Sequence, residues 1–471
     1  MYAAQIHSPG DIRIDEVGDP EPRPGEALVR VRYVGLAPSD LELYRRGPVS
    51  GSQPGQPILV GHECSGEIVA FAPEEEPTAA AGNGSGHRRH SSRLPLLRVG
   101  DRVCVEPTRA CGECDRCRSG KHNLCRRLRF VGQPPESGTL CEYITAPVDR
   151  LHPLPHSLTY AEGALVEPVA VAIHAVDLAE LQAGDSVAIL GAGAVGLSIL
   201  QVVADRGASV TCIADPLAGR RKIAERLSPT CVIDPTTEDL AGIAAQYSGG
   251  SGMSVVFDTS GTSEALRTAT SLVGNGGSVV LVGLPDEDEI TLPASTLRGR
   301  EIAIHTVRGY RNTFPAALTL IATGRTQTRL YASCEFPLDR APDAFEAATS
   351  RPNEVIRALI RVPANSQNDS SAGVAMATPV DVDADPPSDG TPGPASSAPN
   401  ATETQAPSAA DDRAPLPPPA LMPPAHRVRS HRRRHSRNQK RRRLIRRLGK
   451  AGLLVLLCVG IVVIIVFVFG P

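Results

Sequence analysis

The chain has 471 residues, of which 41% are hydrophobic and 21% are charged, so it is long enough for about three domains with buried cores. Aromatic residues make up only 3% and tryptophan is absent, which argues against a surface that stacks on nucleic-acid bases. The formal net charge of −2 hides an asymmetry, because residues 426–450 hold thirteen Lys or Arg and no Asp or Glu. The rest of the chain is therefore acidic, and we expect no nucleic-acid partner.

Residues 1–154 contain short runs of β-type residues separated by glycine and proline, which predicts a β-rich first domain. The pattern begins within residues 1–10, so we expect no secretory signal peptide. Segment Pro73–Arg93 is rich in Glu, Ala, Gly and Ser, which is typical of a mobile surface insertion. The strand-like runs are Ala27–Val34, Ile58–Val60, Gly66–Ala70 and Arg102–Val105.

Residues 155–299 alternate between strand-like and helical patterns, and residues 300–362 return to a mixed pattern. Alternation of this kind predicts an α/β domain with a doubly wound parallel sheet and helices on both faces. The predicted strands are Ser186–Leu190, Ser209–Ala214, Ser254–Thr259 and Gly277–Gly283, and the predicted helices are Gly196–Arg206 and Ala218–Leu227.

The last part of the chain changes composition three times. Residues 363–425 are rich in Pro, Ala, Ser, Thr and Asp, which predicts a disordered linker. Residues 426–450 form a basic neck, which we expect to bind anionic lipid headgroups. Residues 451–469 carry no charge and are long enough for one transmembrane helix. The cations precede this helix, so the sequence predicts a single-pass tail anchor with the N-terminal body in the cytoplasm.

A glycine-rich turn lies between a predicted strand and a predicted helix. Gly191 suits the tight turn, Gly193 allows the backbone to approach a pyrophosphate, and Gly196 allows the helix to pack on the strand. The next strand ends at Asp215, where a carboxylate can accept the ribose hydroxyls. The pattern predicts a dinucleotide site that favours NAD. The nearby Arg220 and Arg221 leave NADP open.

Four cysteines are clustered on one loop: Cys111, Cys114, Cys117 and Cys125. Four thiolates at this spacing suit a closed tetrahedral zinc site, which would brace the loop because it has no vacancy for substrate. An iron–sulfur cluster is the alternative. A metal site rather than a disulfide framework indicates a reducing compartment.

Several motifs together resemble the zinc-dependent medium-chain alcohol dehydrogenase superfamily, and most closely its sorbitol/xylitol (polyol) dehydrogenase branch. The resemblance spans nearly all of residues 1–362. It implies a GroES-like catalytic domain built from residues 1–154 and 300–362, a Rossmann NAD-binding domain between them, and a homo-oligomer. Its marks are the cysteine cluster, the glycine turn, Gly61-His62-Glu63, Val99–Val103, Glu167–His174, Val282-Gly283-Leu284 and Gly309–Pro315.

In this superfamily a second zinc polarises the alcohol oxygen while hydride leaves for the nicotinamide. The resemblance implies that His62, Glu63 and Glu167 are catalytic and hold this zinc, that Ser39 relays the alcohol proton, and that Asp40 orients the histidine. The implied cofactor-binding residues are Gly191, Gly193, Val195, Gly196, Asp215, Arg220, Val282, Gly283 and Leu284.

The sequence departs from the family pattern around the same site. Ala37 stands where the family has a cysteine ligand, which leaves an N,O,O donor set without thiolate. Cys64 adjoins the histidine–glutamate pair, but consecutive strand residues point apart, so we do not expect it to replace that ligand. Leu43 stands where the branch usually has an aromatic residue, and Gly309 where it has an arginine that reaches polyol hydroxyls. His174 lies on an apolar stretch, and we expect it to be packed and hydrogen-bonded rather than catalytic.

These observations favour an NAD-dependent, zinc-containing dehydrogenase that oxidises a secondary alcohol or polyol at a membrane. Two alternatives remain at this point. One is a metal-free oxidoreductase of the quinone-reductase type, which Ala37 favours and the cysteine cluster opposes. The other is a catalytically impaired, membrane-anchored NAD(H)-binding protein, which the combined departures at Ala37, Leu43 and Gly309 favour.

Overall fold

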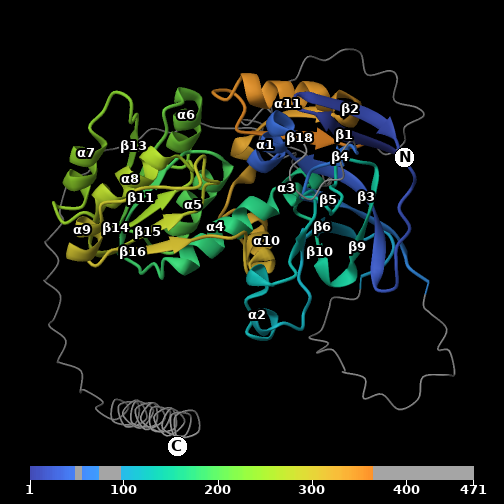
Figure 1. The fold of residues 1–471 in the computed structure, drawn as a ribbon, viewed down its shortest axis with the longest axis horizontal. Helices are drawn as coiled ribbons and strands as arrows, with labels where there is room; N and C mark the ends of the chain where they lie inside the picture. The colour runs from blue at the N-terminus through green and yellow to red at the C-terminus, as the bar shows by residue number, and fades with distance from the viewer. Residues whose placement is uncertain (48–55, 74–96, 364–471) are drawn as a thin grey trace, which may run out of the picture. The chain divides into compact units, whose positions relative to one another are not determined.

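The structure is a computed structural model that describes residues 1–47, 56–73 and 97–363. The predicted insertion beyond Pro73 and the predicted linker, basic neck and transmembrane helix lie outside the described residues, apart from the first linker residue. Figure 1 shows a β-rich region and an α/β region within the described part. Among these residues no helix is both long and apolar enough to cross a membrane.

The β-rich region contains a seven-stranded sheet and two smaller ones. The large sheet has the order β10-β6-β5-β3-β18-β17, with β9 also paired to β3. Its strands are β3 (Glu26–Gly35), β5 (Glu63–Phe71), β6 (Arg102–Val105), β9 (Tyr143–Pro147), β10 (Leu151–Pro153), β17 (Ala332–Pro337) and β18 (Arg357–Arg361). The small sheets are β2-β1-β4, from β1 (Tyr2–Ser8), β2 (Asp11–Glu16) and β4 (Ile58–Leu59), and β7-β8, from β7 (Thr108–Arg109) and β8 (Arg129–Phe130).

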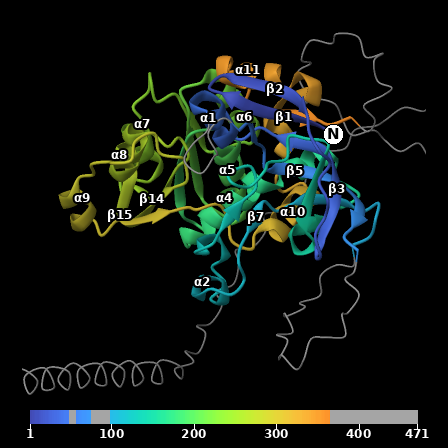
Figure 2. The same cartoon turned by 45° about the vertical axis from the view of Figure 1, so that its right-hand side comes forward.

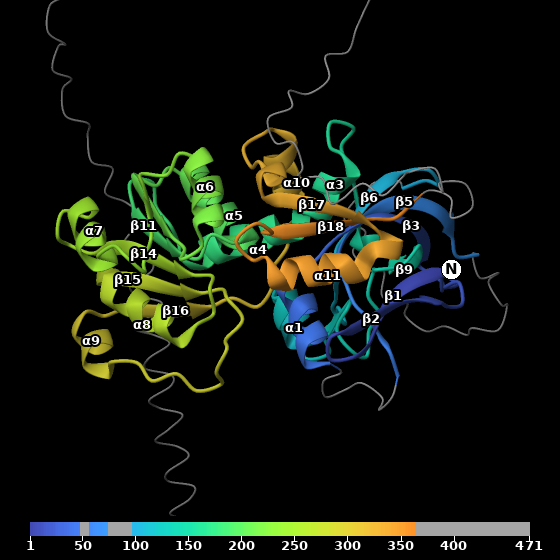
Figure 3. The ribbon, with the colours of Figure 1, turned by 90° about the horizontal axis from the view of Figure 1, so that it is seen from above.

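Strand β3 organises this region because its side chains alternate between the core and the surface. Val29 and Val31 are fully buried, whereas Arg30 between them is only partly buried. Strand β18, from the end of the described chain, pairs with β3. Helix α11 (Ala341–Ser350) packs against β17, β18 and helix α1 (Pro38–Arg46) and buries Phe345. Figure 3 shows α11 beside α1 and the N-terminal strands.

The α/β region is built on a six-stranded sheet with the order β13-β12-β11-β14-β15-β16, in which every neighbouring pair is parallel. Strand β11 is almost entirely apolar, as expected for a strand covered on both faces. The strands are β11 (Ser186–Leu190), β12 (Val210–Ala214), β13 (Cys231–Ile233), β14 (Met253–Asp258), β15 (Val273–Leu281) and β16 (Ala303–Thr306). The helices are α5 (Ala194–Asp205), α6 (Ala218–Arg226), α7 (Leu240–Tyr247), α8 (Ser263–Leu272) and α9 (Ala294–Gly299).

Helix α4 (Val166–Leu178) connects the two regions. It packs against α5 and against α10 (Phe314–Ala322), so its apolar residues join the core of the α/β region. The short helix α3 (Tyr160–Ala164) instead packs against β3, β5 and β6. The shorter elements are α2 (Asp115–Arg118), η1 (His122–Leu124), η2 (Val148–Arg150), η3 (Thr328–Tyr331) and η4 (Leu338–Arg340).

The predicted α/β fold with a GroES-like and a Rossmann domain is confirmed, but two domain boundaries were wrong. The Rossmann sheet does not end at residue 299, because β16 continues it to Thr306. It does not begin at 155 either, because α3 packs on the β-rich sheet. A local pattern predicts a strand or a helix but not the sheet on which it packs, so both limits were misplaced. The chain returns to the β-rich sheet only at Ala332.

One covalent link between two strands was not predicted. Cys212 on β12 and Cys231 on β13 are neighbours across parallel strands and form a disulfide. The four clustered cysteines lie in a separate lobe around α2, which Figure 2 shows below the sheets. We call residues 111–125 the cysteine lobe.

Candidate active site

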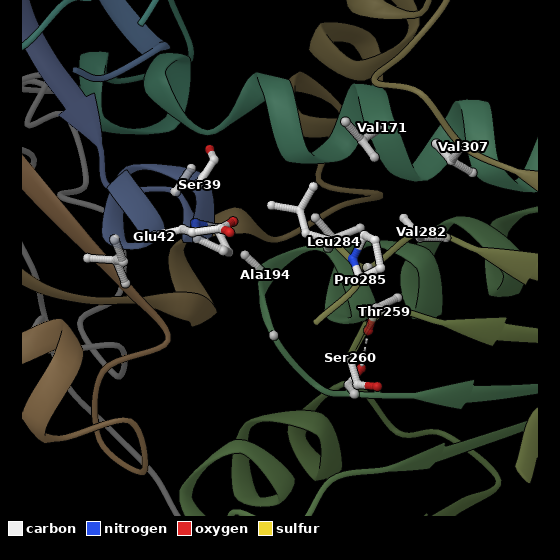
Figure 4. Close-up of a pocket in the computed structure, with 18 of the residues that line it drawn as sticks. Ser39, Glu42, Val171, Ala194, Thr259, Ser260, Val282, Leu284, Pro285 and Val307 are labelled. Carbon is white, nitrogen blue, oxygen red and sulfur yellow. Dashed lines mark hydrogen bonds between the residues drawn. The ribbon is translucent and has the colours of Figure 1, made fainter. Parts of the chain in front are cut away.

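A cavity of about 1210 Å³ is lined by side chains of both regions. On one side lie Ser39 and the residues around it in α1, and on the other lie the residues that follow the strands of the six-stranded sheet, such as Ala194 and Thr259 (Figure 4). A crevice beyond the carboxyl ends of parallel strands is where open α/β sheets bind ligands. The cavity is therefore the candidate active site.

Three potential metal ligands meet in the wall of this cavity. His62, Glu63 and Glu167 are all buried, and each offers a ligand atom within 4.8 Å of the other two. His62 immediately precedes β5, Glu63 begins that strand, and Glu167 lies in the first turn of α4. The structure thus brings together the three residues that the resemblance implies, although about a hundred residues of sequence separate the pair from Glu167. We call them the trio.

Asp40 holds the trio's histidine in place. Its carboxylate lies 3.5 Å from His62 Nδ1 and accepts hydrogen bonds from the backbone N–H groups of Ala37 and Gly61 at 2.9 and 3.1 Å. Asp40 is 1% exposed, so these contacts fix it firmly. Because Nδ1 faces Asp40, the other ring nitrogen, Nε2, is free to bind a metal. Asp40 therefore orients the histidine ring, as predicted.

Glu63 has one satisfied and one unsatisfied oxygen. Its Oε1 lies 3.2 Å from Arg357 Nη2, and this arginine also donates to the carbonyl oxygen of Leu36 at 2.7 Å. The other oxygen, Oε2, is buried without a hydrogen-bond partner among the described residues. A Cβ atom at Gly35 would collide with it, so the glycine makes the room for this carboxylate. Arg357 was not predicted, because a lone arginine in a strand carries no motif.

Burial and charge shift the pKa values of the trio. Burial opposes the charged form of His62, but nearby carboxylates, led by Asp40, outweigh it and raise its pKa to about 9. Burial raises the pKa of Glu167 to about 7 against the opposing charge of His62. Burial also raises the pKa of Glu63. Three buried groups with shifted pKa values beside a cavity are typical of a functional site.

The trio fits a zinc ion. One imidazole and two carboxylates are ligands that catalytic zinc sites use, and three protein ligands leave a position for substrate. The unsatisfied Glu63 Oε2 is an acceptor that a cation would satisfy. Ala37 lines the same cavity and is 4% exposed, so no thiolate stands there. Cys64 does not take its place, because its side chain belongs to the apolar core of the β-rich region.

Two residues on the substrate side, Leu43 and Phe130, lie differently from what the sequence suggested. Leu43 is buried in the core of the β-rich region and does not line the cavity, so the change at this position does not alter the cavity wall directly. Phe130 was not predicted, yet its ring contacts the His62 ring with centroids 5.0 Å apart and lines the cavity. It follows the cysteine lobe on β8, where no local signal points to the cavity. Gly309 lines the cavity as expected.

The cysteine lobe fits a second zinc ion. The four sulfur atoms lie within 4.8 Å of one another. Four of the six Sγ–Sγ pairs in the lobe are 3.4, 3.6, 3.9 and 3.9 Å apart. Tetrahedral zinc with Zn–S bonds of about 2.3 Å requires sulfur atoms about 3.8 Å apart. The lobe is therefore already arranged as a closed site, as predicted.

The glycine turn fits a pyrophosphate. Gly191 has a φ of 105°, and a Cβ there would lie 2.6 Å from Thr259 Oγ1, while a Cβ at Gly196 would collide with the Gly191 carbonyl oxygen. At Gly193 a Cβ would meet only Arg220 Nη1, at 3.9 Å, so this position faces open space at the start of α5. A helix N-terminus beside open space suits phosphate groups. The predicted cofactor residues Val195, Val282, Gly283 and Leu284 line the same cavity.

Asp215 also lines the cavity, but its carboxylate already accepts two backbone hydrogen bonds, which the sequence does not indicate. One oxygen accepts from Ala192 N at 2.7 Å and the other from Leu217 N at 2.8 Å. Arg220 lies 3.7 Å from this carboxylate and also lines the cavity. Arg221 instead binds the Asp215 carbonyl and Asp234, so it faces away from the cofactor site. A carboxylate has further lone pairs, so Asp215 can still accept ribose hydroxyls.

Known proteins are similar to this chain over both regions. Residues 23–156 match the alcohol dehydrogenase GroES-like domain family, and residues 194–323 match the zinc-binding dehydrogenase family. A sorbitol dehydrogenase from Bacillus subtilis is 32% identical over 360 residues, which are 76% of this chain and 97% of that protein.

Two solved structures extend this likeness. One is an oxidoreductase of unknown specificity involved in membrane biogenesis from Escherichia coli, with 31% identity and a TM-score of 0.70 over 77% of this chain and 99% of that chain. The other is a zinc-binding dehydrogenase from Sinorhizobium meliloti bound to NADP, with 30% identity and a TM-score of 0.65. The match covers 76% of this chain and 98% of that chain.

The fold, the trio and the glycine turn define a nicotinamide-dependent dehydrogenase with two zinc-type sites. The chain belongs to the zinc-dependent medium-chain alcohol dehydrogenase family, in the branch that contains the sorbitol dehydrogenases.

Proposed function

We propose that the protein oxidises a secondary alcohol or polyol by hydride transfer to NAD, and that its C-terminal segment tethers it to a membrane. One observation carries the catalytic part: His62, Glu63 and Glu167 meet in the same cavity as the glycine turn. A substrate in that cavity can therefore lie between the trio and the cofactor.

Bound zinc would supply a Lewis acid, and bound nicotinamide would accept the hydride. His62 and the two glutamates hold the metal position, and Asp40 keeps the imidazole ring oriented. Ser39 lines the cavity in the first turn of α1, where its hydroxyl can take the alcohol proton and pass it toward the cofactor ribose and solvent. Phe130 covers one side of the His62 ring and helps to exclude water.

The substrate class rests on the chain's relatives and on the size of the cavity. The chain's relatives include sorbitol dehydrogenases from Bacillus subtilis and Bos taurus, at 32% and 30% identity. The cavity extends well beyond the glycine turn, with both polar and apolar side chains in its wall, so a multi-carbon alcohol has room beside the cofactor. Asp215 favours NAD, because a buried carboxylate opposes a 2′-phosphate.

The membrane tether rests on the sequence alone. The uncharged run 451–469 follows thirteen cations in the neck, a pattern typical of a spanning helix with the body in the cytoplasm. Sedimentation with anionic lipid vesicles tests it: the full chain should sediment with them in high salt, and a chain lacking residues 451–471 should not. Recovery of the full chain in the supernatant would contradict the tether.

The activity is tested by following NADH formation from a panel of polyols, secondary alcohols and primary alcohols. We expect turnover with polyols or secondary alcohols, and its loss in Ser39→Ala and His62→Ala at unchanged NADH affinity. Absence of turnover with the whole panel in zinc-loaded, NADH-binding protein would contradict the proposal.

One observation favours a second candidate, an NAD(H)-binding protein that holds no metal at the trio. The ion pair of Glu63 with Arg357 partly satisfies the glutamate without a metal, and Ala37 removes the thiolate. This candidate predicts zinc in the cysteine lobe only and NADH binding without turnover.

A further inference from the structure

Asn123 is a buried polar residue of the cysteine lobe. It lies in η1, between the lobe cysteines Cys117 and Cys125, and is 6% exposed, whereas its neighbour Leu124 is 42% exposed. Asn123 also lines the cavity. It therefore connects the cysteine lobe with the candidate active site.

The side-chain amide of Asn123 reaches two elements outside the lobe. Its Nδ2 donates to the Arg308 carbonyl oxygen at 3.1 Å and lies 3.3 Å from His174 Nε2. Because a carbonyl only accepts, the nitrogen must face Arg308, and its second proton faces the histidine ring. His174 is buried and not part of the trio, as predicted, and its ring acts here as an acceptor.

The Arg308 carbonyl belongs to one particular wall of the cavity. Val307, Arg308 and Gly309 all line the cavity, and Val307 N donates to the carbonyl oxygen of Leu281 at the end of β15. In the sheet order, β15 and β16 are separated from β12, and hence from Asp215, by β11 and β14. The 307–309 segment thus lies at one end of the cofactor site. Asp215, whose carboxylate is expected to bind the ribose, lies at the other end.

This wall lies at the reacting end of the cavity. His174 lies two turns beyond Glu167 on α4, and Val171 lines the cavity between them (Figure 4). A dinucleotide bound along the strand ends, with its adenosine ribose at Asp215, places its nicotinamide toward β15 and β16. Asn123 consequently ties the cysteine lobe to α4, which carries Glu167, and to the 307–309 segment of the cavity wall.

Stability alone does not account for an asparagine here. Its Oδ1 is buried and accepts no hydrogen bond from any described residue. An unsatisfied buried acceptor costs free energy of folding, and an apolar residue of similar size would avoid that cost. The two bonds made by Nδ2 are what the residue contributes.

We propose that Asn123 is a positioning residue, through which the cysteine lobe holds the 307–309 wall in the geometry that binds the nicotinamide half of the cofactor. This inference rests on the proposed function, because it requires a nicotinamide dinucleotide in the cavity. It gives the remote lobe a specific role in cofactor binding in addition to bracing its own loop.

Calorimetric titrations with NADH and with ADP-ribose, which lacks the nicotinamide, test the proposal. The full-length protein, Asn123→Ala, the isosteric Asn123→Asp and the control Leu124→Ala are compared, with zinc per chain measured in each. In both Asn123 variants we expect the NADH dissociation constant to rise about tenfold, the effect of one lost hydrogen bond, at unchanged zinc content. ADP-ribose binding should stay within about twofold, and Leu124→Ala should change neither ligand.

Three results would overturn the inference. The first is wild-type NADH affinity in both Asn123 variants. The second is an equal loss of NADH and ADP-ribose affinity, which would mean a general disturbance of the fold. The third is loss of zinc from Asn123→Ala, which would make the residue a support of the metal site. If the wild-type protein itself bound neither ligand, the proposed function would fail, and this inference with it.

Discussion

The cysteine lobe and the trio both bring metal-binding side chains within 4.8 Å of one another, yet they are built in opposite ways. The lobe takes four thiolates from a single loop of fifteen residues, Cys111 to Cys125, and leaves no position for a substrate. The trio takes an imidazole and two carboxylates from β5 and α4, buries them beside a cavity, and lacks the thiolate at Ala37. A zinc site with four protein ligands has no free position and stabilises the fold. A site with three protein ligands keeps a position for substrate and can take part in catalysis.

The difference also affects how firmly each site holds its metal. Thiolates bind zinc tightly, and the sulfur atoms of the lobe are already at tetrahedral spacing. In the trio Arg357 competes for Glu63, and burial raises the pKa values of both glutamates. We therefore expect a chelator to remove the trio zinc first and the lobe zinc later.

Replacing His62 by alanine should have the largest effect. The change removes the only nitrogen ligand of the trio, so turnover should fall about 10³-fold, in line with the several kcal/mol that a Lewis acid supplies. Zinc content should fall by about one per chain. Steady-state kinetics and elemental analysis measure both. The control His7→Ala lies on β1 outside the cavity and should keep full activity. Retained turnover in His62→Ala would place catalysis elsewhere.

Replacing Ala37 by cysteine should bring the zinc affinity of the trio closer to that of the cysteine lobe. Residue 37 lies at the N-terminus of α1 and lines the cavity, a position that favours a thiolate. Zinc affinity at the trio should rise about 100-fold, the scale of a strong added ligand, and turnover at limiting zinc should rise with it. Competition with a chelator measures the affinity. Ala348→Cys, which adds a thiol at the cavity wall on α11, should bring no gain. An unchanged affinity in Ala37→Cys would mean that the trio does not bind zinc.

Replacing Asp40 by asparagine should weaken the trio without removing a ligand. The variant keeps the shape of the side chain but loses the charge that faces His62 Nδ1, so zinc affinity at the trio should fall about tenfold to a hundredfold. The lobe zinc should stay in place. Asp15→Asn, which alters an acid paired with His7 away from the cavity, serves as the control. Equal zinc loss from lobe and trio would indicate misfolding rather than loss of orientation.

Replacing Cys64 by alanine should have the smallest effect. Its thiol is buried in the apolar core, so the variant should lose only about 1 kcal/mol of stability and keep both zinc ions. Chemical unfolding and elemental analysis measure these quantities. Loss of one zinc would show that Cys64, rather than one of the trio, completes the catalytic site.

The two sites also show what could be predicted from the sequence. The lobe and the glycine turn are local patterns, and their residues lie where the spacing placed them. The trio was predicted through a family resemblance, because its members are distant in sequence and only the fold brings them together. Periodicity predicted four of the six strands in the six-stranded sheet (β11, β12, β14 and β15) and helices α5 and α6, and the predicted bounds Ser186–Leu190 agree with the structure.

The misses share a physical cause. Arg357, Phe130 and Asn123 act through contacts between distant segments, for which no local spacing gives a signal. The disulfide between Cys212 and Cys231 depends on strand order, which periodicity does not reveal. Strand β16 was assigned to the wrong domain for the same reason.

We expect the trio to bind zinc although it lacks the family's thiolate. The most direct test is the zinc-to-protein ratio of the full-length protein, purified in mild detergent and measured by elemental mass spectrometry beside His62→Ala and Cys114→Ser. If the trio binds zinc, the wild-type chain should carry about two zinc ions and each variant about one. About one zinc ion in the wild type, kept in His62→Ala and lost in Cys114→Ser, would contradict it.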